Sequence, residues 1–359
     1  MLLRFFAACG VFVLSAGLVS ATPAWQQVNL TIVDQHLLPS YQQLAKASAG
    51  LMHQSQQFCA NVNAKQLQAF QAEYHKTMDA GSNIQHIRFG VVDILMRYHR
   101  IQLWPDKHNT GAKQIRKLLA TQDRQVLKPD YFKRASVAIQ GLGTLERILF
   151  NSKGDTLATF KQAPKGAYRC ELAVAISRNV HEMSQGMVSD WTQGDYPYRD
   201  IIKSAERGND FYESSLNVSA RFLNNLSTAI QSIVEQKLAR PLDKNLQRAK
   251  PRRAESWRSQ RSLKNIINNL QATQTLYEVG FSSLVKDRAL DDRINMAFKQ
   301  AIKSAQRIKQ PLSKAVKDPK LRVQLIELQT QCQTLHQLLA STLPEAIGLP
   351  IGFNNLDGD

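Results

Sequence analysis

Apolar residues recur at spacings of three and four from residue 25 onward, which is the period of an amphipathic α-helix. No convincing pair of segments alternates apolar and polar residues as β-strands do. A single proline, Pro39, should kink or break the first helix. The pattern predicts an all-α protein with helices over residues 27–60, 64–79, 84–103, 111–120, 130–150, 168–191, 211–238, 254–279, 291–308 and 318–343.

Glycine and proline mark two gaps between these helices, at residues 151–166 and 192–200. The second gap is the preferred junction between two helical-bundle domains in series, one over residues 22–195 and one over residues 196–343. Residues 344–359 contain two prolines, three glycines and two asparagines. This composition predicts an irregular tail, which we expect to pack near the cleft between the bundles.

The first 21 residues have the features of a secretory signal peptide. Arg4 supplies a positive charge, an apolar run follows over residues 5–19, and Val19-Ser20-Ala21 forms a small-x-small cleavage site. The run is too short for a comfortable transmembrane span, which needs about 20 apolar residues. We therefore expect a protein that is secreted across the inner membrane and is located in the periplasm or cell envelope.

The charge of the chain is strongly basic, because 46 Lys and Arg residues face 29 Asp and Glu residues and leave a formal net charge of +17. In the cytosol such a charge would favour nucleic acid as a partner. Outside the inner membrane, the available anions are lipid headgroups, cell-wall polymers and small ligands such as chelated metals. We therefore expect no nucleic-acid partner and favour a small anionic ligand.

Three cysteines remain after the leader: Cys59, Cys170 and Cys332. An odd number allows at most one internal bridge in an oxidising compartment. Cys332 lies on a stripe of leucines spaced as on one helix face, which predicts a buried free thiol. Cys59 ends one predicted helix and Cys170 lies near the start of another, so we expect these two to form the disulfide.

Two glycines, Gly141 and Gly143, interrupt an apolar helical stretch and are followed by Glu146. Each costs about 1 kcal/mol relative to alanine in a helix. This cost indicates either a close approach of the backbone to a ligand or tight helix–helix packing beside a surface carboxylate.

A basic segment over residues 250–262 is the second candidate for binding chemistry. If it is the opening of a helix, Glu255, Arg258, Ser259 and Ser262 share one face. An arginine fork beside hydroxyl groups suits recognition of a carboxylate or a phosphate. The alternative is a solvated basic face with an internal Glu255–Arg258 pair.

The usual signatures of catalysis are mostly absent. The sequence has no Gly-x-Ser-x-Gly elbow, Walker loop or Cys-x-x-Cys pair. The segment that begins at His181-Glu182 has Gln185 where a zinc peptidase needs its second histidine. The sequence therefore favours a non-catalytic protein.

Four blocks of sequence resemble the imelysin family, specifically its branch of secreted, iron-regulated envelope proteins. They are IQHIRFG with RIQLWPD (84–106), IQGLGTLERILF (139–150), PRRAESWRSQRSLKNI (251–266) and GLPIGFNNLDGD (348–359). The resemblance implies two helical bundles with the functional site in the cleft between them. The Gly-x-His-x-x-Glu motif of the family aligns on Gly141, Gly143 and Glu146, so a glycine stands at the histidine position.

The resemblance and the residue chemistry together imply a periplasmic binding or accessory protein of iron uptake, with a metallopeptidase as the alternative. A structural envelope protein is a third possibility. Iron or a ferric chelate is the expected ligand, and envelope proteins of iron uptake are expected partners. Glu146 is the candidate metal ligand. The candidate ligand-binding residues are Trp104, Asp106, Gly141, Gly143, Glu146, Glu255, Arg258, Ser259, Asn354 and Asp357.

Overall fold

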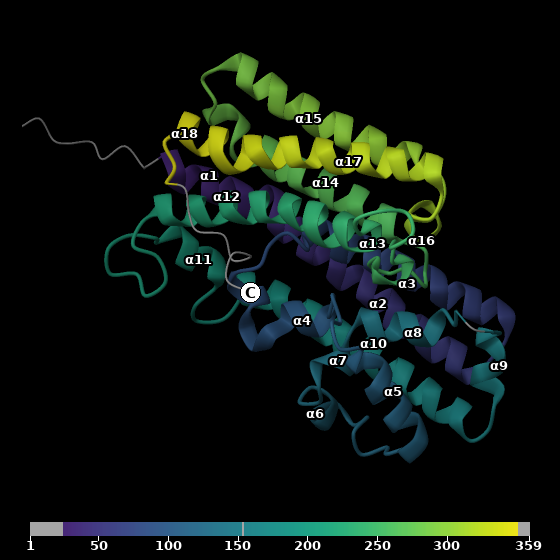
Figure 1. Ribbon diagram of the computed structural model, residues 1–359. Helices are drawn as coiled ribbons and strands as arrows, with labels where there is room; N and C mark the ends of the chain where they lie inside the picture. Colours follow the sequence, from purple (N-terminus) through teal and green to yellow (C-terminus); the bar gives the residue numbers. More distant parts are fainter. Residues whose placement is uncertain (1–23, 153, 351–359) are drawn as a thin grey trace, which may run out of the picture.

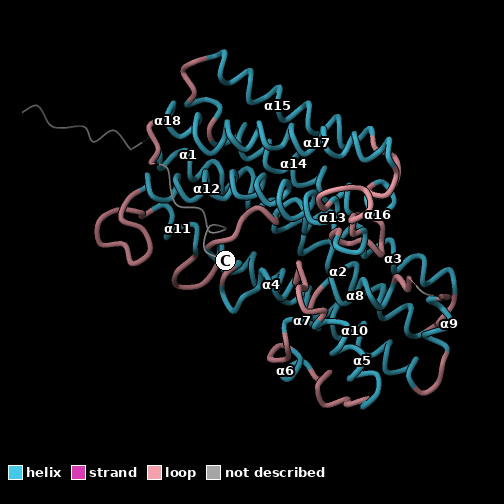
Figure 2. The backbone as a smooth tube through the Cα atoms, in the orientation of Figure 1, coloured by secondary structure: helices cyan, strands magenta, loops and turns pink. Residues whose placement is uncertain are grey.

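The computed structural model describes residues 24–152 and 154–350 of the chain, and every regular element in these ranges is helical. Figure 1 shows the helices in two main groups, which the loops in Figure 2 connect. No helix in these ranges combines the length and the apolar character that a membrane span requires. The predicted all-α class is confirmed. The predicted signal peptide, Asn354 and Asp357 lie outside the described residues.

The first group is built on three long helices in which α2 packs against both α3 and α10. Pro39 does not break the chain's first helix; it is the second residue of α2. A π-helical segment precedes it and keeps the chain helical. The elements are α1 (Ala24–Ile32), the π segment η1 (Val33–Leu37), α2 (Leu38–Ala60), α3 (Ala64–Ile84) and α10 (Lys165–Thr192).

In the second group, α15 packs against both α14 and α17, and α12 packs against the same two helices. Apolar side chains at helical spacing face inward, as Ile294, Phe298 and Ala301 do on α15. Its elements are α12 (Ser215–Ser232), the π segment η4 (Ile233–Ala239), α13 (Arg240–Leu242), α14 (Ser262–Gly280), α15 (Arg288–Arg307), α16 (Leu312–Ala315), α17 (Pro319–Gln337), η7 (Leu338–Thr342) and α18 (Leu343–Ile347).

The two groups share an extensive contact. Helix α1 packs against α12 and α14, and α14 also packs against α3. The buried apolar side chains of both groups belong to one continuous cluster. Figure 1 shows α1 beside α12 in the upper part of the molecule, although it precedes α2 of the lower part in sequence. The division at residues 192–200 into two domains stays a prediction.

Two predicted helices are wrong because the chain leaves helical geometry at particular residues. Residues 84–103 form short turns and α4 (Arg97–Ile101), since Gly90, Leu95 and Met96 have φ values of 74°, 52° and 56°. Residues 130–150 form three short helices, α6 (Pro129–Phe132), α7 (Val137–Gln140) and α8 (Leu142–Leu149). Residues 133–136 separate the first two, and Gly141, which is extended with φ −120° and ψ −171°, separates the last two.

The basic segment also differs from its prediction. A 3₁₀ turn, η5 (Pro251–Arg253), is followed by an irregular loop, and the helix α14 begins only at Ser262. Ser256 and Gln260 have positive φ values of 49° and 59°, which a right-handed helix excludes. The predicted common helix face of Glu255, Arg258, Ser259 and Ser262 is therefore wrong. The remaining short helices are α5 (Thr110–Thr121), α9 (Thr156–Lys161) and α11 (Tyr198–Lys203).

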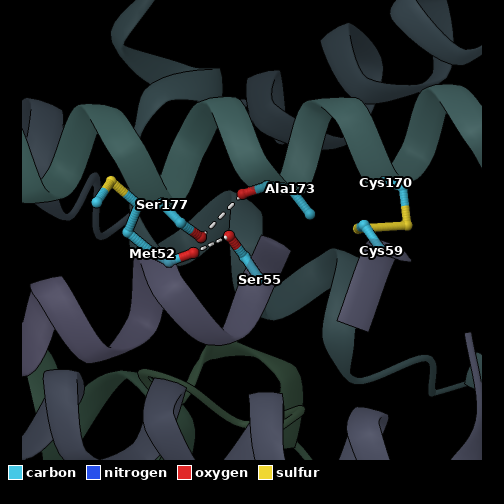
Figure 3. The surroundings of a disulfide bond; sticks show 6 residues. All are labelled: Met52, Ser55, Cys59, Cys170, Ala173 and Ser177. Carbon is cyan, nitrogen blue, oxygen red and sulfur yellow. Dashed lines mark hydrogen bonds between the residues drawn. A yellow bond between two sulfur atoms is a disulfide. The ribbon is translucent and has the colours of Figure 1, made fainter. Parts of the chain in front are cut away.

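The predicted disulfide is confirmed. Cys59 at the end of α2 is bonded to Cys170 in the first turns of α10, with Cα atoms 5.5 Å apart. Figure 3 shows this bridge joining two neighbouring antiparallel helices, whose Ser55 and Ser177 hydroxyls each donate to a carbonyl oxygen of their own helix. Cys332 is free and fully buried, as its leucine stripe predicts.

Candidate functional site

Gly141 lets two stretches of backbone meet. A Cβ atom at this position would collide with the carbonyl oxygens of Arg100 and Ile101. The extended conformation of Gly141 also makes it the N-cap of α8. The glycine therefore brings the last turn of α4 against the start of α8, which supports the packing interpretation of this residue.

Gly143 has different surroundings. A Cβ atom there would meet only the carbonyl oxygen of Leu103, at 3.5 Å, which is an ordinary van der Waals contact. The backbone thus has room for a side chain at the position where the family motif has histidine. The packing explanation that accounts for Gly141 does not account for Gly143.

Glu146 is a buried carboxylate, with 5% of its surface exposed. Its Oε1 accepts hydrogen bonds from the backbone N–H and the hydroxyl of Ser259, both at 2.8 Å. Burial raises the pKa of Glu146, although the bonds from Ser259 and the charges of Arg258 and Arg147 act in the opposite direction. These bonds join α8 to the loop before α14, segments that are more than 100 residues apart in sequence.

Glu255 serves a different purpose from the predicted ligand contact. It is 1% exposed, and its Oε2 lies 2.7 Å from Nζ of Lys237. Gln85 and Gln102 donate to its Oε1 at 3.1 and 2.9 Å, and Asn265 donates to its Oε2 at 3.2 Å. The Glu255 carboxylate is therefore the centre of a buried network that joins the end of α3, the segment after α4, η4 and α14.

Arg258 lies half-buried with its guanidinium stacked on Trp257, 4.3 Å from the ring centroid. Arg252 lies over the same ring at 5.6 Å. Burial and the nearby charges of Arg147 and Arg252 lower the pKa of Arg258 to about 10, which still leaves it protonated at neutral pH. Within the described ranges, no carboxylate lies in ion-pair distance of Arg258.

Asp106 is already engaged by the fold. Its carboxylate accepts the backbone N–H groups of Thr110 at 2.7 Å and Gly111 at 3.0 Å, at the start of α5. Arg147 contacts the same carboxylate at 3.4 Å. Trp104 precedes it, and Nζ of Lys237 lies 6.0 Å from the centroid of the Trp104 ring. Asp106 thus caps a helix and neutralises one of the arginines.

These residues surround a cavity of about 210 Å³ between residues 102–147 and residues 240–258. The described residues that line it carry six basic side chains and two carboxylates. They are Lys107, Arg147, Arg240, Arg252, Arg253 and Arg258 on the basic side, with Asp106 and Glu146 on the acidic side.

Most of the predicted site residues meet here. Six of them line the cavity, namely Trp104, Asp106, Gly141, Gly143, Glu146 and Arg258. Ser259 contacts the site through Glu146, and Glu255 through its network. The sequence analysis did not predict Trp257, Arg240 or Lys237. Trp257 lies in the basic segment over residues 250–262, whereas no local sequence signal marks Arg240 or Lys237. The described residues contain no group of three or more His, Cys, Asp or Glu side chains arranged to hold a metal ion.

Two solved structures illustrate the fold that this chain shares with known proteins. An imelysin-like protein from Psychrobacter arcticum is 18% identical with a TM-score of 0.73, and the match covers 92% of this chain and 97% of that one. A protein described as an iron-regulated protein A precursor from Parabacteroides distasonis is 17% identical with a TM-score of 0.73, covering 90% and 97%. No curated protein matches the sequence significantly. The family model described as Imelysin, which is labelled a peptidase family, matches residues 37–341, and the chain therefore belongs to the imelysin family.

Proposed function

We propose that this chain is a non-catalytic binding protein of the cell envelope, which holds a small anion in the cavity beside α8 and assists iron uptake. The observation that carries the proposal is the excess of positive charge around this cavity, where six basic side chains meet only two carboxylates. The Arg258 guanidinium is half-buried, is stacked on Trp257, and has no carboxylate in ion-pair distance within the described ranges. Glu146 and Asp106 offset only part of the positive charge, and an anionic ligand would offset more of it.

The donors suit an oxyanion in geometry and number. A guanidinium presents its N–H groups in a planar fork that matches a carboxylate or a phosphate. Arg252 shares the Trp257 ring with Arg258, and Arg240 and Arg253 add charge at the rim. Each charge-assisted hydrogen bond contributes about 1.5–3 kcal/mol. Loss of the Arg258 bonds should then weaken binding about tenfold or more.

The link to iron and to the envelope rests on separate support. One structural relative is described as an iron-regulated protein, although its 17% identity concerns the fold alone. The first 21 residues carry the pattern of a signal peptide, and the net charge of +17 suits anionic surroundings. Under this proposal, envelope proteins of iron uptake are the partners, and nucleic acid is not one.

A metallopeptidase is the second candidate, favoured by the family label and by one feature of Glu146. Its Oε2 atom has no hydrogen-bond partner in the described part of the chain and is not sealed from the cavity. A carboxylate in this state could bind a metal ion, but the further ligands would have to come from distant segments. The non-catalytic proposal predicts that the protein does not cleave a peptide library, with or without a chelator. Cleavage that a chelator abolishes and that Glu146→Ala removes would establish the alternative.

Calorimetric titration of the chain with citrate, ferric citrate, phosphate and ferric chloride tests the anion proposal. Citrate or its ferric complex should bind, and Arg258→Gln should weaken that binding about tenfold or more. Arg293→Gln is the matched control, because it removes the same charge from the exposed side of α15 and should leave binding unchanged. Absence of heat with every anion, or equal effects of the two variants, would contradict the proposal.

A further inference from the structure

We infer that the ligand of this cavity is a hydroxycarboxylate, and that Gly143 is the residue that determines this specificity. In this arrangement a ligand carboxylate pairs with Arg258, the ligand hydroxyl donates to Oε2 of Glu146, and the space over Gly143 admits the ligand between them. The inference rests on the proposed anion-binding function and names the class of ligand. Three features of the cavity carry it.

The first feature is a glycine that the fold does not require. Gly143 lies in the first turn of α8, where alanine would be more stable. Its backbone does not need glycine, since no left-handed φ occurs there, and a Cβ would have ordinary contacts. Gly141, two residues earlier, is by contrast required by the fold, because a Cβ atom there would collide with backbone oxygens. Gly143 lines the cavity, so the space it leaves open belongs to the ligand.

The second feature is the open acceptor on Glu146. Both bonds from Ser259 go to Oε1, and Oε2 has no partner in the described ranges while remaining open to the cavity. Glu146 and Gly143 are three residues apart on α8, so they lie on the same face of that helix. An ionised carboxylate can only accept hydrogen bonds, and it repels a second ionised carboxylate. The part of the ligand that meets Oε2 must therefore be a donor.

The third feature is the set of arginines that line the same cavity. Arg258 and its neighbours on the Trp257 ring can hold carboxylate groups but cannot accept a hydrogen bond from a hydroxyl. The cavity thus favours a ligand that offers carboxylates to the arginines and a hydrogen-bond donor to Glu146, within about 210 Å³. A small molecule that carries both is a hydroxycarboxylate. A fully ionised polycarboxylate without a hydroxyl group would leave the Glu146 oxygen unpaired.

Calorimetry with citrate and tricarballylate tests the ligand class, because the two tricarboxylates differ by one hydroxyl group. Citrate should bind at least tenfold more tightly, since a site built for a hydroxyl group rejects the analogue that lacks it. Equal affinity for the two, or tighter binding of phosphate than of citrate, would overturn the hydroxycarboxylate assignment and leave the anion proposal standing. If citrate, tricarballylate and phosphate all fail to bind, both the hydroxycarboxylate assignment and the anion proposal are wrong.

The role of Gly143 is tested with Gly143→Ala against a matched control, Gly81→Ala. Gly81 lies inside α3, and a Cβ there would be 4.0 Å from its nearest contact, a methyl group of Leu44. Both variants should raise the melting temperature by about 1–2 °C, as expected for glycine to alanine in a helix. Only Gly143→Ala should weaken citrate binding, by about tenfold. Unchanged citrate affinity in Gly143→Ala would overturn the assignment of this residue, and an equal loss in Gly81→Ala would do the same.

Discussion

The buried pair of Lys237 and Glu255 gives a quantitative test of how the loop that carries Arg258 is fixed. The two side chains are 6% and 1% exposed, and their charged atoms are 2.7 Å apart. Burial alone would raise the pKa of Glu255, but the Lys237 charge and the hydrogen bonds to the carboxylate hold it below its ordinary value. Lys237 also donates to Gln85 and lies within hydrogen-bond distance of Asn269. Replacing Lys237 with methionine would leave an ionised carboxylate buried without its counter-ion.

The expected loss is large because the remaining charge cannot reach water. Removal of one partner from a buried ion pair costs about 3–5 kcal/mol of the free energy of unfolding. The matched control is Lys133→Met, since Lys133 and Asp130 are 2.6 Å apart but 49% and 83% exposed. An exposed pair of this kind contributes about 0–1 kcal/mol. The two lysines thus have similar ion-pair distances and differ in burial.

Urea denaturation of the two variants measures the difference directly. Lys237→Met combined with Glu255→Gln should be less destabilised than the sum of the single variants, because the second change removes the unpaired charge. The reasoning is refuted if Lys237→Met loses no more free energy of unfolding than Lys133→Met. It is also refuted if the two changes at the buried pair are simply additive.

Three further predictions concern the disulfide, the free thiol and Glu146. Replacing Cys59 and Cys170 with serine opens a link across 111 residues and should lower the free energy of unfolding by about 2–5 kcal/mol in urea denaturation; an unchanged midpoint would contradict this. The Cys332 thiol is fully buried, and burial raises its pKa to about 12. A thiol reagent should therefore modify it only after unfolding. Rapid modification of the native protein would contradict this prediction. Burial raises the pKa of Glu146 in the folded protein, so ionisation of this residue destabilises the fold. Below about pH 4 the wild type should therefore match Glu146→Gln in stability. As the pH rises through the folded pKa, the wild type should lose stability relative to Glu146→Gln. Thermal unfolding of both proteins over a pH series checks the sign, and a constant difference would contradict it.

The sequence pattern was a good guide to the long helices and a poor one to the short segments between them. Apolar spacing alone predicts α2, α10 and α15, since their stripes are long and continuous. It fails at Leu95 and Met96, two helix-compatible residues that adopt positive φ values. Both side chains are exposed, so the spacing of buried apolar residues does not indicate their conformation.

The candidate site was predictable in its members and less so in its geometry. Gly141, Glu146 and Arg258 stand out by residue type in their sequence surroundings, and all three line the cavity. The hydrogen bonds from Ser259 to Glu146 depend on an irregular loop where a helix was expected, so spacing could not predict them. Lys237 could not be predicted either, because its partner Glu255 is distant in sequence and sits in that same loop.

A crystal structure of the protein grown with citrate is the most direct test of the central claim that this cavity holds an anion. The account predicts electron density for the ligand in the cavity, with a carboxylate within about 3 Å of the Arg258 guanidinium and the hydroxyl at a similar distance from Oε2 of Glu146. Density for citrate elsewhere on the protein, with water alone beside Arg258 and Glu146, would contradict it.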